Sequence, residues 1–359
     1  MRRYLFVLLF IAVSGLPASA VRAADDPFAV AGVKVDASAA SASEAFNIAV
    51  NGGRHAAWET LVHRLTREQD WAQIPAIDDD TLNKMISGYQ VADERRSTTR
   101  YVASVTYTFN ADMVRRFLRS ANVAYAASAA TPWLVVPLAP SYAPASAWTA
   151  AWAGNRMAGG AVPLQSPSGD ALDTTLLAPI EFGTASWNDV QPAASRAHAS
   201  QAALVLAGPP SAGHMSVSIR ILSPTGSQSL PPVIVAVPPG TAPAKGYADA
   251  AEAATEAIGE AWKARSAIDF NRHSTITAEV QLDSLAQWGA IQRKLATVPI
   301  VMNVNVAAMN LGQARIVISY AGTPAQLKDF LSQAALALSS RDGGWWLSAQ
   351  AADGGVTNP

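Results

Sequence analysis

The chain has 359 residues, of which 50% are hydrophobic and 15% are charged, with a formal net charge of −1 and no cysteine. This apolar content suffices for two or three separate cores and argues against a disordered chain. The lack of cysteine excludes disulfides, thiolate metal sites and a lipidated cysteine, and the few scattered charges exclude the basic patch that nucleic-acid binding requires.

Residues 1–23 are predicted to be a cleavable signal peptide. The basic pair 2–3 precedes an apolar run over 4–13, and the small residues 18–20 follow as an exit site. The run is shorter than the roughly 20 residues that span a bilayer, so we expect no stable membrane insertion after cleavage. The mature chain would begin between Val21 and Ala24, in the periplasm of a Gram-negative cell.

A first unit is predicted over residues 25–127. Its second hairpin strand alternates apolar residues from Tyr101 to Phe109 with polar ones, which is typical of a half-buried strand. The expected order is β-α-β-β-α, a small sheet with helices on one face. The predicted elements are strand 28–36, a helix from the Ser38–Ser43 caps to Leu65, strands 86–95 and 100–109, and a helix capped by Asn110.

A middle α/β unit is predicted over residues 131–268, after an Ala/Ser linker at 126–131. The short apolar run 132–138, bounded by prolines, indicates a central strand that is buried on both sides. The other predicted elements are helix 145–153, a helix at 192–200 with proline in its first turn, strands 202–207, 215–221 and 233–237, and helix 247–266.

The last unit, residues 273–350, is predicted to be ferredoxin-like. Its expected β-α-β-β-α-β order would pack two helices on one face of a four-stranded antiparallel sheet. The predicted elements are strands 275–282, 300–307, 314–320 and 345–349, with helices 284–296 and 324–338. We expect residues 351–359 to be a disordered tail.

Few residues carry a pattern that points to chemistry. Nucleophile-elbow, P-loop and dinucleotide glycine motifs are absent. His55, Glu59 and His63 are spaced by four and could line one side of a helix as metal ligands, but polar residues are expected on that solvated side. Asp78–Asp80 could suggest calcium, but EF-hand spacing is missing and helix capping is the better interpretation. No cofactor, metal or catalytic residue is therefore predicted.

Two sets of arginines need an explanation. Arg115, Arg116 and Arg119 fall together on the exposed side of one helix, where they could touch phospholipid or an acidic partner, although a solvated face is the simpler interpretation. Arg54 lies near the edge of an apolar helix stripe. Because a buried guanidinium needs a carboxylate, we predict that Arg54 pairs with Glu94 or Glu44.

Ten tryptophans raise the question of a glycan-binding platform. Most fall on apolar stripes or strands, so core packing is the default interpretation. Trp148, Trp152 and Trp187 lie in the irregular part of the middle unit, and these three are the candidates for a ligand groove.

Part of the first unit resembles a known family. The segments Glu44–Leu65, Gly88–Glu94 and Arg100–Phe109 resemble domain-of-unknown-function family 2066, a set of exported bacterial proteins without assigned activity. The first unit is also distantly similar to the amino-terminal domain of flagellar assembly protein T. The middle unit, through its helix-strand step at 194–208, is similar to the amino-terminal domain of TolB-like envelope proteins. These resemblances imply non-catalytic periplasmic adaptors and carry over no catalytic residue.

The sequence therefore predicts an α+β protein of tandem small units that acts as a periplasmic adaptor or scaffold in cell-envelope assembly or maintenance. Its expected partner is another envelope protein, whose identity the sequence does not give. The alternative is a module that binds peptidoglycan, another glycan or a small solute, and an uncharacterised enzyme ranks third.

Overall fold

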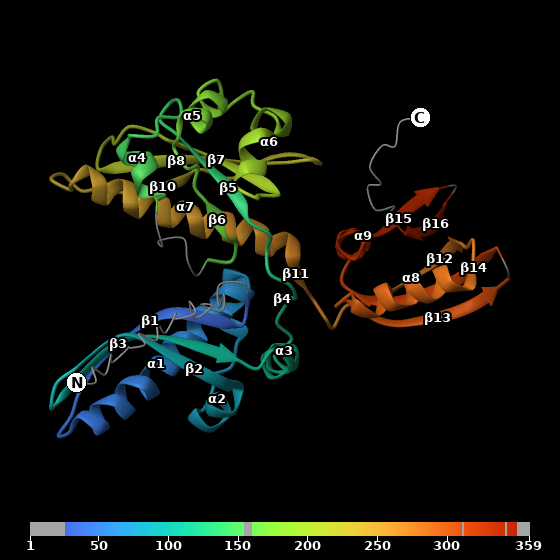
Figure 1. Ribbon diagram of the computed structural model, residues 1–359, viewed down its shortest axis with the longest axis horizontal. Helices are drawn as coiled ribbons and strands as arrows, with labels where there is room; N and C mark the ends of the chain where they lie inside the picture. Colours follow the sequence, from blue (N-terminus) through green and yellow to red (C-terminus); the bar gives the residue numbers. More distant parts are fainter. Residues whose placement is uncertain (1–25, 154–159, 311, 342, 350–359) are drawn as a thin grey trace, which may run out of the picture.

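The computed structural model describes residues 26–153, 160–310, 312–341 and 343–349. It is a mixed α+β chain in which a first, a middle and a last unit follow one another along the sequence (Figure 1). The predicted signal peptide at 1–23 and the predicted tail at 351–359 lie outside the described residues.

The first unit is a three-stranded antiparallel sheet with the long helix α1 across one face. The strand order is β1-β3-β2, so β2 lies at an edge. The predicted elements are present in their predicted β-α-β-β-α order, and the structure adds the helices η2 and α2 where a loop was expected between α1 and β2. The elements are β1 (Ala29–Ser38), α1 (Ala42–Leu65), the 3₁₀ helix η2 (Glu68–Gln73), α2 (Asp79–Met85), β2 (Ile86–Arg96), β3 (Arg100–Phe109) and α3 (Ala111–Ser120).

A glycine lets α1 approach β3 closely. A Cβ at Gly53 would lie 2.4 Å from the Tyr107 hydroxyl oxygen and 2.7 Å from Val35 Cγ1, which is closer than real Cβ contacts. The Tyr107 hydroxyl donates a 2.6 Å hydrogen bond to the Val50 carbonyl in α1. Burial at this contact raises the pKa of Tyr107 to about 12.

The middle unit has three layers. Its sheet has the order β10-β8-β7-β5-β6, with β9 on β8, and β5 runs parallel to both β6 and β7. Helices α4 and α7 bury one face, and α5 and α6 bury the other. The elements are β5 (Trp133–Leu138), α4 (Ala147–Ala151), β6 (Leu164–Gln165), α5 (Ala171–Leu177), α6 (Trp187–Arg196), β7 (Gln201–Ala207), β8 (His214–Ser223), β9 (Gly226–Ser229), β10 (Val233–Ala236) and α7 (Pro243–Ser266).

The helix predicted at 192–200 begins earlier than its proline suggested. Helix α6 starts at Trp187, because the Asp189 carboxylate accepts a 2.7 Å hydrogen bond from the Ser186 backbone N–H and so closes the first turn. Pro192 therefore lies inside the helix and not in its first turn.

The last unit departs from the predicted four-stranded antiparallel sheet. It has five strands in the order β13-β14-β12-β16-β15, and β16 runs parallel to β12. Ala335, at a φ of 53°, follows α9, and the hairpin β15-β16 begins where the sequence predicted more helix. The elements are β12 (His273–Gln281), α8 (Leu285–Thr297), β13 (Val301–Met309), β14 (Gln313–Ala321), α9 (Pro324–Gln333), β15 (Leu336–Arg341) and β16 (Gly344–Ala349).

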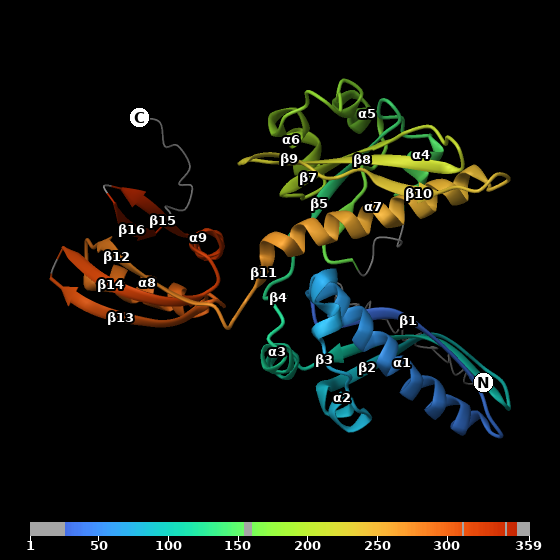
Figure 2. The same cartoon turned by 180° about the vertical axis from the view of Figure 1, so that it is seen from behind.

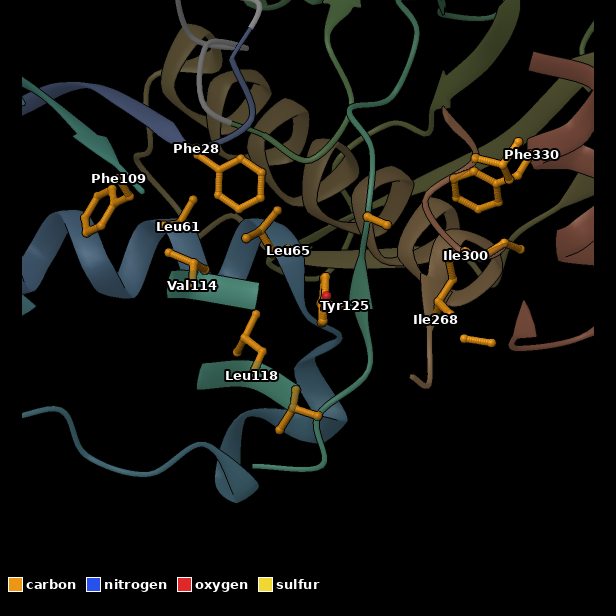
Figure 3. Close-up of a cluster of buried hydrophobic side chains, with 14 of the residues drawn as sticks. Phe28, Leu61, Leu65, Phe109, Val114, Leu118, Tyr125, Ile268, Ile300 and Phe330 are labelled. Atoms are coloured by element: carbon orange, nitrogen blue, oxygen red, sulfur yellow. The ribbon is translucent and has the colours of Figure 1, made fainter. Parts of the chain in front are cut away.

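The first and last units are joined by a short two-stranded ladder. Strand β4 (Tyr125–Ala126) pairs antiparallel with β11 (Ala267–Ile268), so the predicted linker begins in a buried strand. The Tyr125 ring stacks on Phe270 at 4.8 Å. Figure 3 shows Tyr125 between first-unit side chains and those of the last unit. One continuous hydrophobic cluster therefore runs through both units.

Candidate functional site

The three candidate groove tryptophans do not form one groove. Trp148 and Trp152 are each 1% exposed and pack edge to face at 5.2 Å in the core between the sheet and α7. Trp148 donates its indole N–H to the Val205 carbonyl at 3.1 Å. Trp187 packs against the cluster on the opposite face of the sheet. The three tryptophans therefore lie in two separate packing regions, one on each face of the sheet, and do not line one groove.

Arg54 is held by an amide and not by the predicted carboxylate. Its guanidinium donates to the Asn83 side-chain oxygen in α2. Glu94 lies 3.9 Å from Arg96 on its own strand. The physical reason is that Arg54 is only partly buried on the α2 side of α1, so a neutral acceptor suffices there.

Several polar residues in and before α1 and α2 have structural partners. His55 Nε2 lies 2.7 Å from an Asp79 carboxylate oxygen, and Asp78 caps α2 by accepting the Thr81 N–H at 2.8 Å, as predicted. His63 stacks on Trp71. Within the described ranges, no three His, Asp or Glu side chains gather as a set that could hold a metal ion, and no helix there is both long and apolar enough to cross a membrane.

The arginines of α3 pack on aromatic rings as well as facing solvent. The Arg115 guanidinium lies 5.0 Å from the Phe28 ring centre, and that of Arg119 lies 5.8 Å from Phe270. Arg115 also pairs with Asp112 at 3.4 Å. Two of the three arginines therefore have a packing role as well as the solvated position that was predicted.

The middle unit contains a buried carboxylate, Asp173, that was not predicted from the sequence. Asp173 is 3% exposed and accepts hydrogen bonds from the Ser168 N–H and hydroxyl, both at 2.6 Å, and from Arg196 Nε at 2.9 Å. Burial alone would raise the pKa of Asp173, but the hydrogen bonds from Ser168 and Arg196 outweigh it and hold the pKa below its ordinary value. Since its oxygens are occupied, Asp173 fixes the start of α5 and is not poised for chemistry.

A buried lysine joins the first unit to helix α7. Lys263 is 3% exposed, and its ammonium donates to the backbone carbonyls of His63 at 2.6 Å and Thr66 at 2.7 Å. The ammonium also pairs with Glu260 at 2.5 Å. Glu260 in turn accepts the backbone N–H of Glu68, at the start of η2. Figure 2 shows α7 running between the middle sheet and the first unit. We call these residues the α7 junction.

The α7 junction also has an aromatic side. His63 and Trp71 are stacked with ring centres 3.6 Å apart, and the Lys263 ammonium lies 5.6 Å from the Trp71 ring centre. Desolvation lowers the pKa of His63 below 6.5; Glu59 and Glu260 oppose this shift and Lys263 adds to it. The folded chain therefore binds a proton at His63 less tightly than the unfolded chain does.

This difference predicts a pH-dependent loss of stability. His63 contributes stability that is present above pH 6.5 and is lost as the pH falls through its lowered folded-state pKa. His63→Phe keeps an aromatic ring on Trp71 but removes the proton-binding group. In urea unfolding between about pH 8 and pH 5, the natural chain should lose stability relative to the variant as the pH falls. Parallel curves for the two proteins would contradict this assignment.

The edge strand β2 is an exposed surface of the first unit. Every residue from Ser87 to Arg96 is exposed, and the outer side of β2 has no neighbouring strand among the described residues. Tyr89 is 44% exposed and Val91 is 38% exposed. We call residues Gly88–Ala92 the β2 edge.

The β2 edge has an apolar face beside the core. Tyr89 and Val91 pair with Tyr107 and Val105 of β3, which are both fully buried under α1. Residues directly opposite each other in an antiparallel pair point to the same face of the sheet. Tyr89 and Val91 therefore lie on the face that α1 covers, but at the edge, where they are exposed. The ladder is interrupted between Ala92 and Arg95, where Asp93 has a φ of 53°. The regular part of the edge therefore ends at Ala92.

No protein-family model, curated protein or solved structure matches the chain. The resemblance of the first unit to family 2066 therefore stays a prediction from its own residues.

Proposed function

We propose that this protein is an exported, non-catalytic adaptor of the cell envelope, which binds an extended segment of a partner protein along the β2 edge. The observation that carries the proposal is an edge strand, without an outer neighbour in the part of the chain that the structure describes, which carries exposed Tyr89 and Val91. An incoming strand would gain backbone hydrogen bonds from the edge and apolar contacts at alternate positions. The basic and apolar pattern over residues 2–20 supports export of the chain.

The edge defines the chemistry of its partner. The bound segment would be extended over about five residues, matching Gly88–Ala92, with apolar side chains at every second position. Beyond Ala92, the charges Asp93, Glu94, Arg95 and Arg96 select against segments whose own charges do not match. Self-pairing of β2 about Val91 would place Asp93 opposite Tyr89, which disfavours that register for a second copy.

The adaptor proposal is tested by photocrosslinking in intact cells. A crosslinking amino acid at Val91 should capture one partner, and mass spectrometry should place the crosslinks from positions 89 and 91 about two residues apart in one extended segment. The Tyr89→Lys, Val91→Lys double variant should lower capture from a probe at Gln90 roughly tenfold or more, because charge on an edge opposes strand pairing.

The matched control is the same probe at Leu172, which is 48% exposed on helix α5. Equal capture from Leu172, or crosslinks scattered over many proteins, would contradict strand addition at β2. Retention of the chain on isolated cell-wall sacculi, unchanged in the double lysine variant, would favour a glycan-binding module instead.

A further inference from the structure

A second open edge lies in the last unit, at strand β13. This strand is at the end of its sheet, and its outer side has no partner strand among the described residues. Apolar side chains on it are exposed: Met302 by 55%, Val306 by 43% and Met309 by 39%. Natural proteins usually protect such edges, so an open apolar edge indicates a binding surface.

The β13 edge lacks two of the features that block edge-to-edge pairing, charge and proline, and its ladder with β14 is regular from Asn303 to Val306, between irregularities at Val301/Asn303 and Val306/Ala308. Residues Val301–Met309 contain no charged side chain and no proline. By contrast, β2 ends in four consecutive charged residues, and β15, at the other edge of the same sheet, is shorter and ends at Arg341. Because nothing on β13 is charged, two identical strands can approach each other without like-charge repulsion.

From this pattern we infer that β13 pairs antiparallel with β13 of a second copy, about a twofold axis at Asn305. In that register, Val304 of each copy lies opposite Val306 of the other copy, and the two Asn305 residues lie opposite each other. The two five-stranded sheets would join into one continuous sheet of ten strands. The inference concerns the last unit alone and does not rest on the proposed partner of β2.

The faces of the strand match in this register. Val304 and Val306 pair within the chain with Ile318 and Ile316, which are fully buried on the helix-covered face. Asn305 pairs with Val317 on the opposite, uncovered face. Twofold pairing about Asn305 therefore stacks apolar side chains beside the core and brings two amides together on the polar face. A shift by one residue would place valine opposite asparagine and lose both matches.

A second copy also fits better than a foreign strand because the sequence of β13 reads similarly in both directions about Asn305, with Asn-Val before it and Val-Ala-Ala after it. The same strand therefore supplies both halves of the contact, as an isologous interface requires. Strand pairing alone gives a small interface, so we expect a dissociation constant on the order of micromolar.

The test uses the natural lack of cysteine. In the chain from Ala24 onward, Asn305→Cys should place two thiols across the axis, with Cβ atoms about 5 Å apart, and mild oxidation should give a covalent dimer. Thr277→Cys, exposed on the same sheet face but in the central strand β12, is the control and should stay monomeric. Sedimentation of the unmodified chain should show a dimer at tens of micromolar.

Val306→Lys should raise the dissociation constant roughly tenfold or more, because two ammonium groups would enter the pairing strands, whereas Leu172→Lys should leave it unchanged. The thermal midpoint of the Val306→Lys monomer should stay near that of the natural chain, since Val306 is already exposed. A monomer at these concentrations, or a dimer that survives Val306→Lys and leaves Asn305→Cys uncrosslinked, would overturn the inference.

Discussion

Replacing Lys263 with methionine should lower the free energy of unfolding by about 2–4 kcal/mol, since hydrogen bonds from charged donors contribute about 1.5–3 kcal/mol each and are not fully additive. Methionine keeps the length and apolar stem of the side chain but removes the ammonium donor from the His63 and Thr66 carbonyls, leaving Thr66 only the longer 3.4 Å hydrogen bond from the Trp71 indole N–H. Thr66 is fully buried, so water replaces that donor poorly. The measurement is urea unfolding followed by tryptophan fluorescence, because Trp71 lies at the same junction.

The control for this change is on the same helix. Lys245 pairs with Asp249 at 2.7 Å, but its side chain is 69% exposed. Lys245→Met should cost no more than about 0.5 kcal/mol, as is usual for exposed pairs four residues apart. Equal effects at positions 245 and 263 would show that the α7 junction does not hold the first unit to the middle unit.

The elements that could be predicted from the sequence are those with a clear period. In β3, the alternation from Ala103 to Phe109 identified both the strand and the face that carries its apolar residues, because successive side chains of a strand point to opposite faces. The helix ends at Ser41, Asp78 and Asn110 were also recognisable, since each side chain caps its own backbone through a local bond. Such signals need no knowledge of distant contacts.

The end of the last unit shows where local signals failed. Alanine and leucine over 334–338 favour helix, which is why the helix was predicted to reach Leu338. The chain instead leaves the helix after Gln333, and Leu336 and Leu338 both become buried as alternate residues of β15. The burial of two leucines against the existing core outweighs a propensity of a few tenths of a kcal/mol per residue.

The candidate site depended on contacts between distant segments, so the sequence could not reveal it. The partners of Lys263 lie about two hundred residues away, and the lysine itself looks like an ordinary helix-surface residue. The partner of Arg54 was not predicted for the same reason, because Asn83 lies on another helix and no spacing rule connects the two residues. The open edges of β2 and β13 became visible only with the order of strands in each sheet.

Trp148→Ala should destabilise the middle unit by about 3–5 kcal/mol, the usual cost of removing a large buried aromatic side chain. The indole is 1% exposed, packs against Trp152 and Tyr247, and satisfies the Val205 carbonyl. Truncation therefore leaves a cavity and removes one hydrogen bond to the Val205 carbonyl in the same place. The measurement is the loss of unfolding free energy in urea, compared with Trp187→Ala.

Trp187 is the matched control because it lies on the other face of the same sheet and is only partly buried. Its truncation should cost about 1–2 kcal/mol, because less apolar area is removed from the core. A groove built from these residues would give the opposite pattern, in which both variants fold as stably as the natural chain and lose only a ligand. A strongly unequal loss of stability therefore assigns Trp148 to the core that packs on β5 and β7.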